Sequence, residues 1–140
     1  MALTNLTKGT VVGSEGGSAT SNLAQGLAKA WINHKQGGGN STRDSLNIGS
    51  VTDNGGGDYT LNFSSAMANS DFACQCTSSG DHNNYGYLVA VGPTVASVDN
   101  EFTATTSSFR AGTGFASATN SSKSSADAHQ IFNSVHGALA

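Results

Sequence analysis

SVTDNGGGDYTLNF, residues 50–63, is the stretch that decides how the whole chain is interpreted. In its second half Tyr59, Leu61 and Phe63 alternate with polar residues, which is the period of a half-buried β-strand. The Asp-Asn-Gly run at 53–55 predicts a turn, because Asn and Gly tolerate positive φ. The stretch therefore predicts a β-hairpin that contributes Leu61 and Phe63 to the inner face of a sheet.

Similar alternation recurs before and after the hairpin. Residues 27–33 fit a strand with Trp31 on one face and Ala30 and Ile32 on the other. Residues 85–91 are apolar on both faces, which predicts a central strand. These segments extend the β pattern on both sides of the hairpin.

The remaining segments carry shorter signals. Leu46 and Ile48 are expected to share a face, and the break in phase at Gly49 predicts a bulge or bend. A weaker strand is expected around Phe109, followed by a polar loop. The C-terminal residues 129–135 predict a strand with Ile131, Asn133 and Val135 on one face and Phe132 on the other.

These signals predict one fold class. Seven or eight short strands, with turn signals roughly every ten residues and no convincing long helix, indicate an all-β fold: an antiparallel β-sandwich or jelly roll. Residues 27–140 are expected to form this head domain. Residues 1–26, with the flexible run GSEGGSAT at 13–20, are expected to be an extended N-terminal arm.

Composition excludes two classes of partner. Only 11% of the 140 residues are charged, the formal net charge is -3, and the six Lys and Arg are scattered, whereas a nucleic-acid binder needs a basic stripe. No apolar run is long enough to span a bilayer, and the first residues lack the pattern of a secretory signal. We therefore expect no nucleic acid, no membrane insertion, and a chain made and kept soluble.

Cys74 and Cys76 are the clearest candidates for special chemistry. Two residues apart on a strand, they point the same way, at the limit of the separation that a disulfide can bridge. Buried free thiols beside Phe72 are the favoured interpretation; a metal site with His82, or an intermolecular link, is the alternative. The run Gly55–Asp58 is similar to a single turn of a calcium-binding repeat, but such sites need stacked copies, so an open hairpin loop is favoured.

The sequence contains no recognisable catalytic frame. The four histidines are spread out, and no G-x-S-x-G elbow is present. Surface or packed positions are the default for His34, His82, His129 and His136, although the last three are free to converge in space. We expect no enzyme activity, no catalytic residues, no cofactor and no metal. A hydrolase would need Asp81, His82 and a second carboxylate to meet in a pocket.

Residues 27–67 resemble a module of bacteriophage tail-fibre and other virion-surface proteins, especially from phages of marine bacteria and cyanobacteria. The matching letters are A-K-A-W (28–31), R-D-S (43–45), S-x-T-D-N-G-x-G-D-Y-T-x-N-F (50–63) and A-M (66–67), and V-x-G-x-L-A (135–140) is similar to the last strand of that module. Unlike typical fibre proteins, the chain is short and has no shaft repeat.

The resemblance implies a non-enzymatic structural protein of the virion surface, made in the host cytoplasm. A tail-fibre or tail-tip component involved in host attachment is expected; the alternative is a capsid decoration protein, a head fibre or knob anchored by the N-terminal arm. The resemblance also implies a homo-oligomer, expected to be a homotrimer, whose arm contacts other virion proteins. Trp31, Tyr85 and Tyr87 are candidate surface or interface aromatics, or else core residues.

A second class of function is a stand-alone carbohydrate-binding module. In that case Trp31, Tyr85 and Tyr87 would act as stacking platforms for a sugar. In either class, the polar loops expected at 77–84 and 111–125 are free to touch a host surface glycan or protein.

Overall fold

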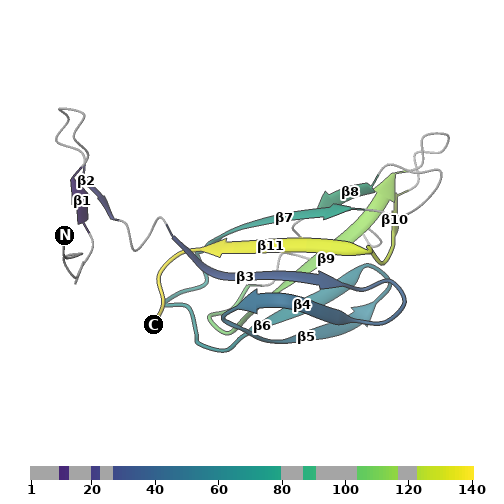
Figure 1. Ribbon diagram of the computed structural model, residues 1–140, viewed down its shortest axis with the longest axis horizontal. Helices are drawn as coiled ribbons and strands as arrows, with labels where there is room; N and C mark the ends of the chain where they lie inside the picture. The colour runs from purple at the N-terminus through teal and green to yellow at the C-terminus, as the bar shows by residue number, and fades with distance from the viewer. Residues whose placement is uncertain (1–9, 13–19, 23–26, 80–86, 91–103, 117–122) are drawn as a thin grey trace, which may run out of the picture.

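The computed structural model describes residues 10–12, 20–22, 27–79, 87–90, 104–116 and 123–140 (Figure 1). These ranges form strands, turns and bends, and contain no helix. The strands are β1 (Thr10–Val12), β2 (Thr20–Asn22), β3 (Ala28–Lys35), β4 (Ser41–Leu46), β5 (Ile48–Gly55), β6 (Asp58–Phe63), β7 (Ala73–Ser79), β8 (Tyr87–Ala90), β9 (Ser108–Ala116), β10 (Lys123–Ser125) and β11 (Gln130–His136).

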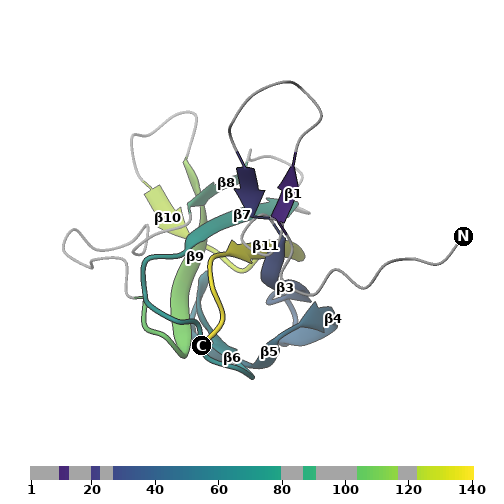
Figure 2. The ribbon, with the colours of Figure 1, turned by 90° about the vertical axis from the view of Figure 1, so that its left-hand side faces the viewer.

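Two antiparallel sheets make up the body of the protein. One contains four strands in the order β4-β3-β11-β7, and the other contains β10-β9-β6-β5 with β8 also paired to β9. Seen from the end, the strands of the two sheets surround a common interior (Figure 2). The expected all-β sandwich is confirmed, with more strands than the seven or eight predicted.

The middle strands of the four-stranded sheet follow the expected alternation. On β3, Ala30, Ile32 and His34 are buried, and on β11 Ile131 and Val135 are buried on the same face. The intervening residues of both strands lie on the outward face, because successive side chains of a strand point to opposite sides. This face of the sheet is where the candidate site lies.

The hairpin predicted at 50–63 is present as β5 and β6. Tyr59 and Leu61 are fully buried in the core, as the pattern predicted. The predicted turn at 53–55 is wrong by two residues, because β5 contains a register shift before Gly55 and continues through it. The turn lies at Gly56 and Gly57, and Gly57 adopts a φ of 71°.

Leu46 and Ile48 do not share a face, contrary to the prediction. Asn47 between them has a φ of 55°, and it separates β4 of one sheet from β5 of the other. Leu46 is therefore exposed on the outer face of the four-stranded sheet, while Ile48 packs against the core. The break in phase does mark the crossing between sheets, and a register shift follows at Ile48 and Ser50.

The strand expected to be weak, around Phe109, is the longest in the described part of the chain. β9 lies between β6 and β8, and Phe109, Ala111 and Thr113 are buried along it. The loop expected at 111–125 is therefore wrong, because Ala111–Ala116 belongs to β9 and Lys123–Ser125 to β10.

Two other expectations are corrected in part. Among the described strands β8 pairs with β9 alone, so the central position expected for it is not seen in this part of the chain. The first three residues of the loop expected at 77–84 belong to β7, and the rest lies outside the described residues. Within the region expected to be the arm, β1 and β2 pair as a separate two-stranded sheet.

Aromatic rings fill the core between the sheets. Phe63, Phe72 and Phe109 contact one another, with ring centroids 5.6 to 6.1 Å apart. Leu61 and Ile131 are fully buried in the same cluster. In the part of the chain that the structure describes, no helix has the length and hydrophobicity needed to cross a membrane.

Candidate functional site

The outward face of the four-stranded sheet carries a groove lined by side chains from three neighbouring strands. β3 contributes Trp31, β11 contributes Phe132 and Ser134, and β7 contributes Gln75 and Thr77. Pairing places Trp31, Ser134 and Gln75 in one row across the sheet. Phe132 and Thr77 belong to the next row, two residues along each strand.

The groove exists because a small residue stands among larger ones. Ser134 lies directly between Trp31 and Gln75 in its row, and Phe132 is its neighbour on the same face of β11. The hollow has a volume of about 280 Å³, close to the lower end of small-molecule sites. Two aromatic side chains border the serine: Trp31 is its neighbour on β3, and Phe132 is its neighbour along β11.

The lining carries no charge. Gln75, Thr77 and Ser134 supply an amide and two hydroxyls, which both donate and accept hydrogen bonds. Within the described residues, none of these three side chains is hydrogen-bonded to another group of the protein. They are therefore available to a bound molecule.

Apolar side chains continue beyond the groove. Phe132 is 42% exposed, and Leu46, which pairs with Trp31 across β3 and β4, is 48% exposed. Large exposed side chains of this kind gathered on one sheet face indicate an interaction surface more often than a solvated face.

Two of the three aromatic residues singled out in the sequence, Trp31 and Tyr87, lie on strands of different sheets. Trp31 is half-buried and lines the groove. Tyr87 belongs to β8 in the other sheet, and Tyr85 lies outside the described residues. Trp31 is thus the one candidate of the three that the structure places in a site.

Phe132, Gln75, Thr77 and Ser134 were not predicted as site residues. The signal for Phe132 was present in the sequence, since it falls on the opposite face from Ile131 and Val135. The polar residues carry no comparable signal, because they join the site only through the pairing of β7 with β11.

A second group of polar side chains lies inside the sandwich, around Tyr59. The Tyr59 hydroxyl donates to Asn133 Oδ1 at 3.2 Å and lies 3.4 Å from Cys76 Sγ. His34 packs edge-on against the Tyr59 ring, with centroids 4.7 Å apart. Burial lowers the pKa of His34 to about 4 and raises the pKa of Tyr59.

The two thiols have low reactivity in this environment. Burial raises the pKa of Cys76 to about 11 and also raises the pKa of Cys74, so both are protonated at neutral pH. Both are free and half-buried, where buried free thiols were the favoured prediction, and Phe72 is buried just before them. Among the described residues, no three His, Cys, Asp or Glu side chains are grouped to hold a metal ion. His82 and Asp81 lie outside the described part.

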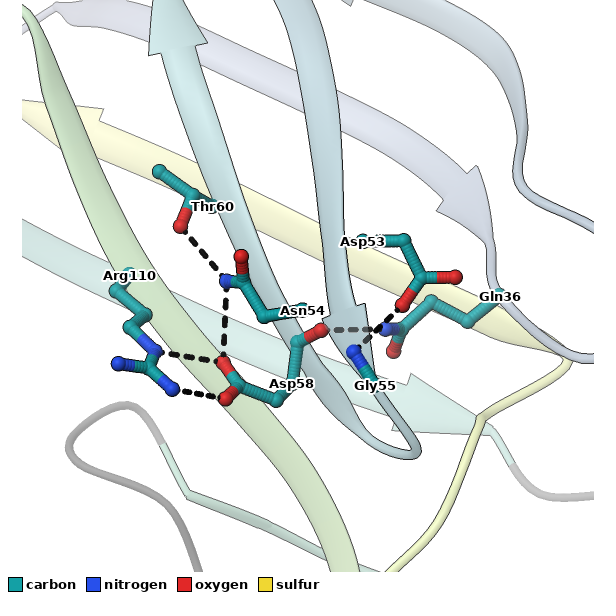
Figure 3. A network of polar contacts seen from close by, with 7 residues as sticks. All are labelled: Gln36, Asp53, Asn54, Gly55, Asp58, Thr60 and Arg110. Atoms are coloured by element: carbon teal, nitrogen blue, oxygen red, sulfur yellow. Dashed lines mark hydrogen bonds and ion pairs between the residues drawn. The ribbon is translucent and has the colours of Figure 1, made fainter.

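The carboxylate of Asp58 is held in a polar network at the tip of the hairpin (Figure 3). Arg110 of β9 binds it through two nitrogens, with Nε 2.8 Å from Oδ1. Asn54 also donates to Oδ1, and Gln36 donates to the Asp58 carbonyl. The Arg110 guanidinium, followed by Asn54, holds the pKa of Asp58 below its usual value. Asp58 therefore anchors the hairpin to β9 as a carboxylate.

Comparison of the chain with protein-family models, with curated proteins and with solved structures gives no match. The site is therefore interpreted from its geometry and chemistry. An uncharged hollow with aromatic flanks and free hydrogen-bonding groups is suited to binding.

Proposed function

We propose that the protein is a non-enzymatic homotrimeric binding protein of the phage particle surface, a tail-fibre or tail-tip component that takes part in attachment to the host. The observation that carries this proposal is the uncharged groove between Trp31 and Phe132 on an outward sheet face. A rigid sheet is a good support for such a surface, because the strands fix the positions of the side chains that contact the partner.

The state of the titratable groups favours binding over chemistry. His34 and Cys76 are buried and uncharged at neutral pH, and neither lines the groove. Asp58 is occupied by its pair with Arg110. These three groups thus have structural roles.

The placement on a phage particle is supported by the sequence resemblance of residues 27–67. In the structure these residues include strands β3 to β6, which contribute to both sheets. β3 also supplies Trp31, so the module that carries the resemblance contributes one flank of the groove.

The first test is location on the particle. Particles of a phage whose genome encodes the chain would be labelled with an antibody against the protein and imaged by electron microscopy. Label at the tail is the expected result. Label on the capsid would assign the chain to capsid decoration instead, and particles without label would overturn the proposal.

The second test is attachment to cells. The purified protein, labelled with a fluorophore, is expected to bind host cells, and Phe132→Ala is expected to reduce that binding at least tenfold. Asp53→Ala is the control, since Asp53 is exposed on β5 of the other sheet and is not part of the groove. Equal binding by both variants would exclude the groove as the attachment surface.

A further inference from the structure

We infer that the groove between Trp31 and Phe132 binds a neutral saccharide chain. This inference rests on the proposed attachment function and names the chemical class of its ligand. It is argued from the shape of the hollow, from its charge and from the polar groups around it.

The shape suits the flat face of a sugar ring. Ser134 forms a low floor, and the rings of Trp31 and Phe132 come from adjacent strands and adjacent rows on the same face. Sugar rings present apolar C–H faces, which pack on aromatic rings, and polar edges. A hollow of about 280 Å³ accommodates a short part of a longer chain.

The charge of the lining selects the class of ligand. An anionic ligand would be expected to meet Arg or Lys, and a cationic one would meet carboxylates. The lining contains neither kind of group. An uncharged ligand is the complementary partner for this surface.

The polar groups are matched to hydroxyls. Gln75 offers both a donor and an acceptor, and Thr77 and Ser134 each offer a hydroxyl that does both. Sugar hydroxyls also donate and accept, and these groups border a hollow whose surface is mostly apolar, as the face of a sugar ring requires. Gln75 and Thr77 lie on exposed positions of β7, at the side of the groove opposite Trp31.

Trp31 gives a direct measurement, because it is the single tryptophan of the chain. The probes are neutral tetrasaccharides of glucose, galactose, mannose and N-acetylglucosamine, with a sulfated tetrasaccharide as the charged comparison. At least one neutral probe is expected to shift the tryptophan emission in a saturable way. The absence of a shift with every neutral probe, or a shift with the sulfated probe alone, would overturn the inference.

Variants locate the binding in the groove. Ser134→Leu places a larger side chain on the floor, and Gln75→Ala removes an exposed polar group; each is expected to weaken binding at least tenfold. Asp53→Ala, on the other sheet, is expected to leave binding unchanged. Both groove substitutions are on the outward face, and circular dichroism would verify that the sheets are intact. Unchanged affinity in both groove variants would contradict the inference.

A second copy of the chain is the competing occupant. Dilution of the protein without sugar would then shift the Trp31 emission, and that result would overturn the saccharide site. Attachment is measured separately with cells and particles. Cell binding without any response to sugar would refute the saccharide site and leave the proposed function in place. A response to sugar in a protein that is absent from particles would refute the proposed function and leave the saccharide site in place.

Discussion

His34 is the residue with the most unusual surroundings in the core. Its side chain is 1% exposed, and neither ring nitrogen has a hydrogen-bond partner. Charging such a ring would require desolvation without compensation, so burial lowers its pKa from 6.5 to about 4. His34 is therefore neutral in the folded protein over most of the acidic range.

We expect stability to fall as the pH drops from about 6.5 to about 4. In this window the unfolded chain binds a proton at His34 and the folded chain does not, so protonation favours unfolding. The shift corresponds to a loss of about 3 kcal/mol in the free energy of unfolding across the window. Urea unfolding at pH 7, 5 and 4 would measure it.

His34→Phe is the control for this prediction. Phenylalanine keeps a ring against Tyr59 but does not titrate, so its stability is expected to change much less over the same range. Asp58 does not interfere, because its pKa is held below 3.8 and its contribution is lost only at lower pH. An equal loss in the variant would show that another group is responsible.

Of the glycines that the structure describes, Gly57 is the one whose replacement is expected to cost most. A Cβ there would overlap the Thr113 carbonyl and lie 2.5 Å from the Ala126 nitrogen, and the φ of 71° disfavours any other residue. Gly57→Ala is expected to lower the free energy of unfolding by about 2–4 kcal/mol. Gly56→Ala is the control, since a Cβ there meets nothing within 4 Å. Equal stability of the two variants in urea would contradict this account.

At the scale of elements, the hairpin of β5 and β6 is fastened to β9 by Asp58 and Arg110. Asp58→Ala is expected to cost about 1–2 kcal/mol, because the side chain of Arg110 is 40% exposed and solvent weakens the ion pair. Asp53→Ala is expected to cost less than about 1 kcal/mol, because the exposed Asp53 carboxylate accepts a hydrogen bond from the neighbouring Gly55 amide. Thermal unfolding would rank the two, and the reverse order would exclude the anchor.

Strands with large alternating side chains could be predicted from the sequence. β3, β6 and β11 each bury bulky residues at every second position. β9 was underestimated because its buried positions after Phe109 are Ala111 and Thr113, with glycines between them. The burial of β9 comes from its neighbours on both edges, which local sequence does not encode.

The outward-facing residues of the site could be predicted one by one, but their grouping into a groove could not. The outward positions of Trp31 and Phe132 follow from the alternation of their own strands. Their proximity depends on the register of β3 against β11, two strands far apart in the sequence. Ser134 acquires its role from the same register, since only its larger neighbours make it the floor of a hollow.

At the scale of the molecule, two apolar surfaces lie in different places: the groove on the outer face of the four-stranded sheet, and the end of the sandwich where β3 begins. The start of β3 and the C-terminus lie at the same end (Figure 1), where His136 pairs with Ala28. Leu27 and Leu139, the residues next to these points, are 55% and 46% exposed. Apolar side chains at this end are suited to contact between copies, which leaves the sheet face free for a ligand.

On the proposed function, we expect the protein in solution to be a trimer of about 42 kDa, three times the 14.1 kDa chain. Light scattering coupled to size exclusion would measure this mass. Replacing both end residues, in a Leu27→Ser and Leu139→Ser double variant, is expected to shift the mass toward the monomer, because each copy loses apolar contact area.

Phe132→Ala is expected to keep the trimer mass while it weakens ligand binding. A wild-type protein that stays at 14.1 kDa at high concentration would refute the trimer, and loss of the trimer in Phe132→Ala would show that the groove face is itself the contact between copies.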